Sequence, residues 1–278
     1  PVETGEKRTE ADGPEERNDE RPEKTWNAQQ QDVEGEPEAV KERLQEACAL
    51  VQQGREAYDR ANYQESVALF LRALEIYEDI LGAEHLETAL VYHNLAVVYQ
   101  KLSAYKLAED WCNKAIRVHE KVLEVHPDAA DDYDVLAQIY EKQGKYKEAE
   151  ALSRKAVRMG RELLGEEHPN TTKYLNSLAV IYEAQGKYEE AEVLYQQVLR
   201  TMEKVLGEKH VGTAVGYNNL ALNYWEQERY REAEVLFQKS FAIRKEVLEA
   251  GHPDIASNYH NLAAVYERQG RFAEAEGL

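Results

Sequence analysis

The chain has 278 residues, of which 31% are charged, and its formal net charge at pH 7 is -19. This much charge favours an elongated architecture with a large surface over one densely enclosed core, and the negative sign disfavours nucleic acid and anionic membranes as partners. No apolar run is long enough to predict membrane insertion, and Cys48 and Cys112 lack the spacing of a disulfide framework or a metal site. We therefore expect a cytoplasmic protein.

Residues 1–35 form an acidic segment that is rich in Glu, Asp, Arg, Gln and Pro and almost lacks apolar side chains. Such a segment cannot bury enough apolar surface to offset the entropy lost on ordering, so we predict a disordered N-terminal tail. Its one large aromatic residue is Trp26, for which two roles stay open: a place in a featureless linker, or an intramolecular contact with the folded part. The folded part, residues 36–278, is predicted to begin near Pro37, which suits a first helical turn.

The folded part repeats one pattern along its length. Each copy contains a leucine, an aromatic residue four positions later and an alanine thirteen positions later. The leucines are Leu95, Leu136, Leu178, Leu220 and Leu262, at intervals of 41, 42, 42 and 42 residues. This self-similarity predicts about five full repeats, beginning near residue 47, and a truncated sixth.

Each repeat is predicted to form two amphipathic helices, because its apolar residues recur every three or four positions. Gly144, Gly186 and Gly270 separate the two helices and suit the left-handed conformation that ends a helix. Leu-Gly and His-Pro pairs then stop the second helix and start the next repeat. Since a helix pair can bury its apolar face only against its neighbours, we predict an all-α solenoid of stacked helix-turn-helix repeats.

The segments LGEEHPNT, NNLALNY, NLAVVY and QGKYEEAEVLYQQVL resemble the kinesin light chain type of tetratricopeptide repeat, over residues 47–278. The resemblance implies a right-handed superhelix of the 42-residue repeat subtype. It also implies a scaffold that binds a protein or peptide in its concave groove, such as a motor–cargo adaptor associated with the cytoskeleton. The repeats are similar as well to those of nephrocystin-type ciliary proteins and of sensor arrays on signalling ATPases. A ligand-sensing array of a larger protein and a self-assembly element therefore stay open as alternatives.

The resemblance further implies that the partner lies along the first helix of each repeat, beside the repeated leucine. The residues predicted to contact it are Arg55, His93, Asn94, Lys101, Gln138, Lys142, Lys173, Asn176, Asn218, Asn219, Leu222, Trp225, His260, Asn261 and Arg268. Asparagine carries both a donor and an acceptor, so the asparagines among them could hold the backbone of an extended peptide. The alternative is that they make helix-to-helix hydrogen bonds. Trp225 is either an aromatic anchor in the groove or a residue buried against the sixth repeat.

The charges along this face are nearly balanced and the chain is acidic, so we expect a neutral or basic partner. Five histidines recur once per repeat, too far apart to share a metal ion, and are predicted to be turn and packing residues: His85, His126, His168, His210 and His252. No phosphate-binding loop, nucleophile elbow or metalloprotease motif occurs in the sequence. We therefore predict a protein that is not an enzyme and that uses no metal and no cofactor.

Overall fold

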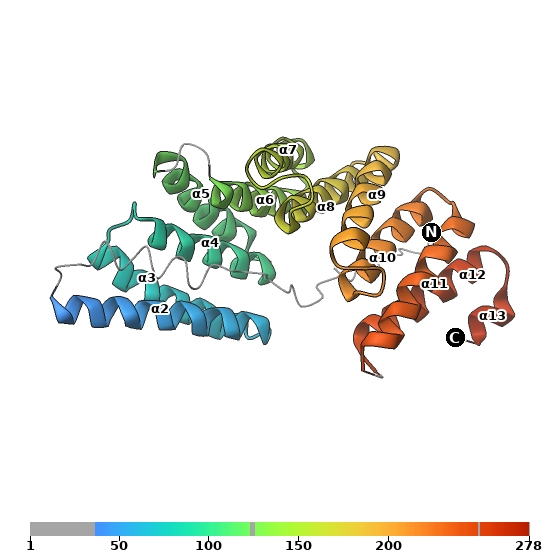
Figure 1. The fold of residues 1–278 in the computed structure, drawn as a ribbon, viewed down its shortest axis with the longest axis horizontal. Helices are drawn as coiled ribbons and strands as arrows, with labels where there is room; N and C mark the ends of the chain where they lie inside the picture. The colour runs from blue at the N-terminus through green and yellow to red at the C-terminus, as the bar shows by residue number, and fades with distance from the viewer. Residues whose placement is uncertain (1–36, 123–125, 250, 278) are drawn as a thin grey trace. The chain divides into compact units, whose positions relative to one another are not determined.

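A computed structural model describes residues 37–122, 126–249 and 251–277, and within these ranges every regular element is an α-helix (Figure 1). The described residues form two compact blocks, which we call the N-terminal block (residues 37–165) and the C-terminal block (residues 166–277). The predicted tail and Trp26 lie outside the described residues. No helix within the described ranges is both long enough and apolar enough to cross a membrane.

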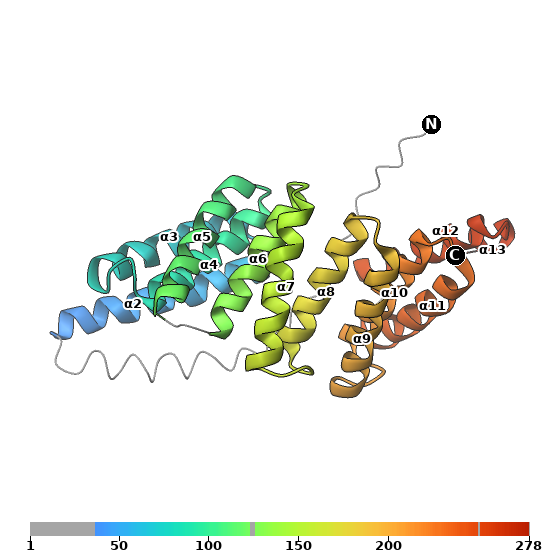
Figure 2. The same ribbon diagram turned by 90° about the horizontal axis from the view of Figure 1, so that it is seen from above.

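The helices occur as consecutive pairs, and within each block they stack in chain order (Figure 1, Figure 2). The N-terminal block contains α2 (Glu38–Asp59), α3 (Tyr63–Ile80), α4 (Leu86–Lys101), α5 (Tyr105–Val122), α6 (Pro127–Lys142) and α7 (Tyr146–Leu163). The C-terminal block contains α8 (Pro169–Ala184), α9 (Tyr188–Val205), α10 (Val211–Glu226), α11 (Tyr230–Val247), α12 (Pro253–Arg268) and α13 (Phe272–Glu276). The predicted all-α solenoid of helix-turn-helix repeats is confirmed.

The repeated small and apolar residues form the core of each pair. The repeated leucines are all buried, from Leu95 in α4 to Leu262 in α12, and so are the alanines Ala108, Ala149, Ala191 and Ala233 of the second helices. Because alanine has almost no side chain, the two helices of a pair can approach closely at these positions. The turns between the helices behave as predicted, since Gly144, Gly186 and Gly270 have φ angles of 73°, 73° and 74°.

The recurring histidines cap the first helix of each repeat. In all five, Nδ1 of the imidazole ring accepts a hydrogen bond from the backbone N–H two residues further on, at 3.0 to 3.2 Å. The first N–H groups of a helix have no partner within the helix, so each ring satisfies one of them. The histidines predicted as turn and packing residues therefore have a more specific role, as N-caps.

Replacing His168 with alanine should lower the free energy of unfolding by about 1 kcal/mol, because the N–H of Asn170 loses its acceptor at the start of α8. Chemical denaturation followed by circular dichroism measures the change. His168→Asn is the matched variant, since its side-chain oxygen can accept the same hydrogen bond and should recover most of the loss. Equal losses in both variants would show that the ring acts by packing.

Candidate binding surface

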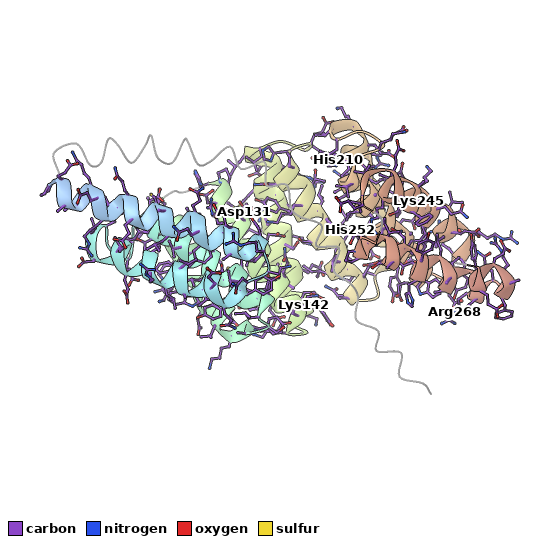
Figure 3. The ribbon with its side chains drawn as sticks, turned by 90° about the horizontal axis from the view of Figure 1, so that it is seen from below. Asp131, Lys142, His210, Lys245, His252 and Arg268 are labelled. Atoms are coloured by element: carbon purple, nitrogen blue, oxygen red, sulfur yellow. The ribbon has the colours of Figure 1, made fainter. Side chains whose placement is uncertain are left out.

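The predicted contact residues lie on the first helices of both blocks and differ in how accessible they are. Asn94 and Asn218 are buried, with 4% and 6% of their surface exposed. The exposed ones are Lys142, His260 and Arg268, and the half-buried ones are Arg55, His93, Lys101, Gln138, Lys173, Asn176, Asn219, Leu222, Trp225 and Asn261. Figure 3 labels Lys142 at the end of α6 and Arg268 at the end of α12. Each block thus presents its own row of polar groups on first helices.

Asparagine side chains link the first helices of the C-terminal block. Asn219 on α10 donates from Nδ2 to Oδ1 of Asn176 on α8 at 3.1 Å, and Asn261 on α12 donates to Oδ1 of Asn218 on α10 at 3.2 Å. The helix-to-helix hydrogen bonds that the sequence left open are therefore present. Each bond uses one donor hydrogen of one amide and one lone pair of the other, so every amide in the row keeps hydrogen-bonding capacity beyond it.

Trp225 packs against a core that includes the sixth repeat, which is one of the two roles that the sequence left open for it. Its ring contacts Tyr230 of α11 edge-on, with the ring centroids 5.1 Å apart, and it packs at the margin of the C-terminal core. The guanidinium carbon of Arg268 lies 5.5 Å from the Trp225 ring centroid. Tyr230 and Arg268 hold the half-buried ring in place, and a fixed aromatic ring next to a cation is a suitable anchor for a partner side chain.

A buried carboxylate organises the corresponding part of the N-terminal block. Asp132 on α6 is fully buried, and its two oxygens lie 2.7 Å from Nδ1 of His93 on α4 and 2.6 Å from Nδ1 of His119 on α5. Because a carboxylate only accepts hydrogen bonds, each ring donates its Nδ1–H. The cluster joins three helices and fixes the orientation of His93, the predicted contact residue. Asp132 and His119 were not predicted from the sequence.

Cys112 lies beside this cluster, and its Sγ donates to the backbone oxygen of Asp132 at 3.2 Å. Burial, together with the negative charges of Asp132 and Asp134, raises the pKa of the Cys112 thiol well above its usual range. The thiol therefore stays protonated and has little nucleophilic character. Within the described ranges, no group of three or more His, Cys, Asp or Glu side chains is arranged so that it could hold a metal ion.

The second helices carry a recurring glutamate that binds the turn of the following repeat. Tyr140 and Gln143 donate hydrogen bonds to Glu109, and Gln227 and Arg229 donate to Glu192. Burial raises the pKa of Glu109, but the hydrogen bonds from Gln143 and Tyr140 and the charge of Lys145 outweigh burial and hold this pKa below its usual range. These contacts were also missed from the sequence. They fix neighbouring repeats to each other and so support the first-helix rows.

Comparison with known proteins agrees with this architecture. A tetratricopeptide repeat family model matches residues 45–121, 132–204, 173–246 and 212–278. No curated protein matches the chain.

Several solved structures are similar. BtubC (BKLC) from P. vanneervenii has 25% sequence identity and a TM-score of 0.63, covering 87% of this chain and 88% of that one. The nearly identical TPR-like repeats of a Podosopora anserina putative kinesin light chain have 28% identity and a TM-score of 0.61, covering 70% and 92%. A signal transduction ATPase with a tetratricopeptide repeat sensor, from Pyrococcus horikoshii, has 17% identity and a TM-score of 0.65, covering 80% of this chain and 32% of that one. At that identity the likeness is one of fold alone.

Proposed function

Because the chain belongs to the tetratricopeptide repeat family, we propose that it is a non-enzymatic scaffold that binds a protein or peptide along the first helices of its repeats. The observation that carries this proposal is the row on α8, α10 and α12, where paired asparagines lie on the same helices as Trp225 and Arg268. The amide pairs are preorganised, so little side-chain entropy is lost when a peptide backbone binds them.

We further propose that the partner is neutral or basic and that the protein is an adaptor of kinesin light chain type. The net charge of -19 supports the first point, since it would repel an acidic partner at long range. The 28% identity to the P. anserina repeats supports the second. First helices that begin at residues 86, 127, 169, 211 and 253 support the 42-residue subtype. A cytoplasmic, cytoskeleton-associated location would follow from that assignment.

The experiment is a screen of the full chain against an array of neutral and basic peptides, followed by titration of the binders by fluorescence anisotropy. Trp225→Ala should weaken binding by about 2 kcal/mol, roughly thirtyfold, because it removes the aromatic anchor. Asn219→Ala should also weaken it. The matched control is Val235→Ala, which truncates an exposed apolar residue on second helix α11.

Circular dichroism checks that all three variants keep their helicity. If binding survives Trp225→Ala and Asn219→Ala but is lost in Val235→Ala, the partner lies on the second helices and the proposed surface is wrong.

A further inference from the structure

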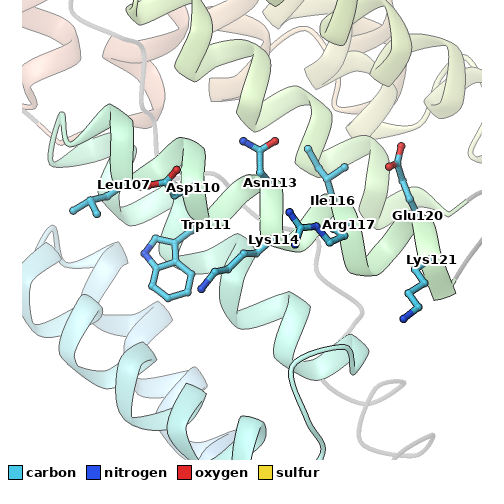
Figure 4. Close-up of a pocket in the computed structure, with 9 residues that line it drawn as sticks. All are labelled: Leu107, Asp110, Trp111, Asn113, Lys114, Ile116, Arg117, Glu120 and Lys121. Atoms are coloured by element: carbon cyan, nitrogen blue, oxygen red, sulfur yellow. The ribbon is translucent and has the colours of Figure 1, made fainter.

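The second helix α5 bears a hollow on its outer side that the first-helix row does not include. Its volume is about 1060 Å³, and the lining residues within the described ranges come from α5 (Figure 4). Leu107, Trp111, Lys114 and Lys121 recur along it at intervals of four, three and seven residues, so they follow one stripe of the helix. The hollow therefore runs lengthwise along α5, from an apolar end to a cationic end.

The apolar end is exposed and rigid. Leu107 leaves 47% of its surface open to solvent. The Trp111 ring stacks on Tyr92 of α4, with the centroids 5.6 Å apart, and Nζ of Lys114 lies 4.0 Å from the Trp111 ring centroid. An aromatic ring held between a second ring and a cation loses little freedom when a partner packs against it. This end is suited to receive an aliphatic side chain.

The other end is positively charged in a chain that is otherwise acidic. Lys114, Arg117 and Lys121 line it, and within the described ranges Arg117 makes no ion pair or hydrogen bond. Two carboxylates at this end are already paired, Glu84 with Lys121 at 2.5 Å and Glu120 with Lys155 of α7 at 3.1 Å. Helices α5 and α7 together hold nine Lys or Arg against six Asp or Glu, whereas the whole chain holds 34 against 53. The surface over α5 and α7 is therefore locally basic, in contrast to the chain as a whole.

We propose that the hollow on α5 is a second docking surface, separate from the first-helix row, and that its occupant is an acidic amphipathic helix of a partner protein. A helix laid along α5 repeats its side chains with the same period as the stripe, so a leucine can meet Leu107 and Trp111 while carboxylates one and two turns on meet Lys114, Arg117 and Lys121. Nucleic acid fits less well, because its regularly spaced phosphates would also meet Asp110 beside Trp111 and Glu120 beside Lys121, whereas a helix can place uncharged side chains there.

The test uses the full chain and a synthetic peptide of glutamate, leucine and alanine whose leucines recur every third and fourth residue. Two double variants, each with a single remaining tryptophan, report where the peptide binds. Trp26→Phe combined with Trp225→Phe keeps Trp111, and Trp26→Phe combined with Trp111→Phe keeps Trp225. We expect the peptide to shift the emission of Trp111 to shorter wavelength and to leave the emission of Trp225 unchanged. A shift of Trp225 alone would place the peptide on the first-helix row and overturn this proposal. The proposed scaffold function would stand in that case, but its neutral or basic partner would not.

Charge reversal provides the second measurement, by isothermal titration calorimetry at low salt. Arg117→Glu should weaken peptide binding by about tenfold or more, because one attractive charge becomes repulsive. Arg200→Glu is the matched control, since Arg200 is exposed, occupies the same position on α9 of the C-terminal block and does not line the hollow, so it should change affinity by less than about twofold. Equal effects of the two variants would show a nonspecific attraction and refute the site. Tighter binding of a 20-nucleotide oligothymidine than of the peptide at Trp111 would refute the protein partner.

Discussion

Replacing Asp132 with alanine should lower the free energy of unfolding by about 3 to 5 kcal/mol, the cost of removing one partner from a buried polar cluster. Asp132 is 0% exposed and accepts hydrogen bonds from His93 and His119 on two other helices. Without it, both Nδ1–H groups lose their acceptor, and that of His119 is too deeply buried to find water. Urea denaturation followed by circular dichroism gives the change directly.

Two variants separate the hydrogen bonds from other effects of the substitution. Asp132→Asn keeps the shape but offers one acceptor in place of two, so its loss should fall between those of the alanine variant and the wild type. Asp131→Ala, one residue earlier on α6 and only half-buried, controls for removing a carboxylate from this helix. If Asp132→Ala costs no more than Asp131→Ala, the cluster does not hold the three helices together.

Periodicity was sufficient to predict the fold because the features that build it are the same in every repeat. Leu178 and Ala191, for example, occupy positions that the other repeats fill with the same residue types, and both are buried where two helices approach. The glycine between the helices recurs for an equally simple reason, since its φ angle of 73° at Gly186 lies in the left-handed region. A property that every copy requires becomes visible as a repeat.

One contact between neighbouring repeats could not be predicted in this way, because different residues form it at each interface. This contact joins one position on each second helix to one position on the first helix of the following repeat. His119 faces Asp132 in the N-terminal block, while Arg244 donates to Oδ1 of Asn258 at 2.7 Å in the C-terminal block. Between α9 and α10 the two facing positions hold Met202 and Gly216. A Cβ added to Gly216 would lie 3.1 Å from Sδ of Met202, so the methionine side chain fills the space that the glycine leaves. Such pairs break the period, and the departure from the period is the signal that could have revealed them.

For the first-helix row, the sequence predicted which helices carry the asparagines. It could not decide whether each asparagine binds a ligand or a neighbouring helix. Asn176 and Asn219 are 43 residues apart, one more than the repeat, so they occupy different positions in their repeats and no comparison of like positions pairs them. The choice depends on side-chain rotamers and on the offset between neighbouring helices, which spacing along one helix does not determine.

Tyr182→Ala is the other substitution with a large expected effect, a loss of about 3 to 5 kcal/mol in the free energy of unfolding, which is the range for truncating a large buried aromatic side chain. Tyr182 on α8 is 6% exposed and lies one turn beyond the buried Leu178, with Nζ of Lys187 5.3 Å from its ring centroid. Truncation would leave a cavity that the surrounding helices can close only in part, because their positions are fixed by the next repeat.

Phe272→Ala is the matched control within the same block, since it also removes an aromatic ring but one that is 66% exposed at the start of α13. It should cost less than about 1 kcal/mol, because most of its surface is already in water. Both variants are measured by urea denaturation under identical conditions. A loss below about 1 kcal/mol for Tyr182→Ala would mean that this position does not belong to the core. The helical register would then be wrong, and the predicted contact residues, which share that register on the first helices, would no longer face a partner.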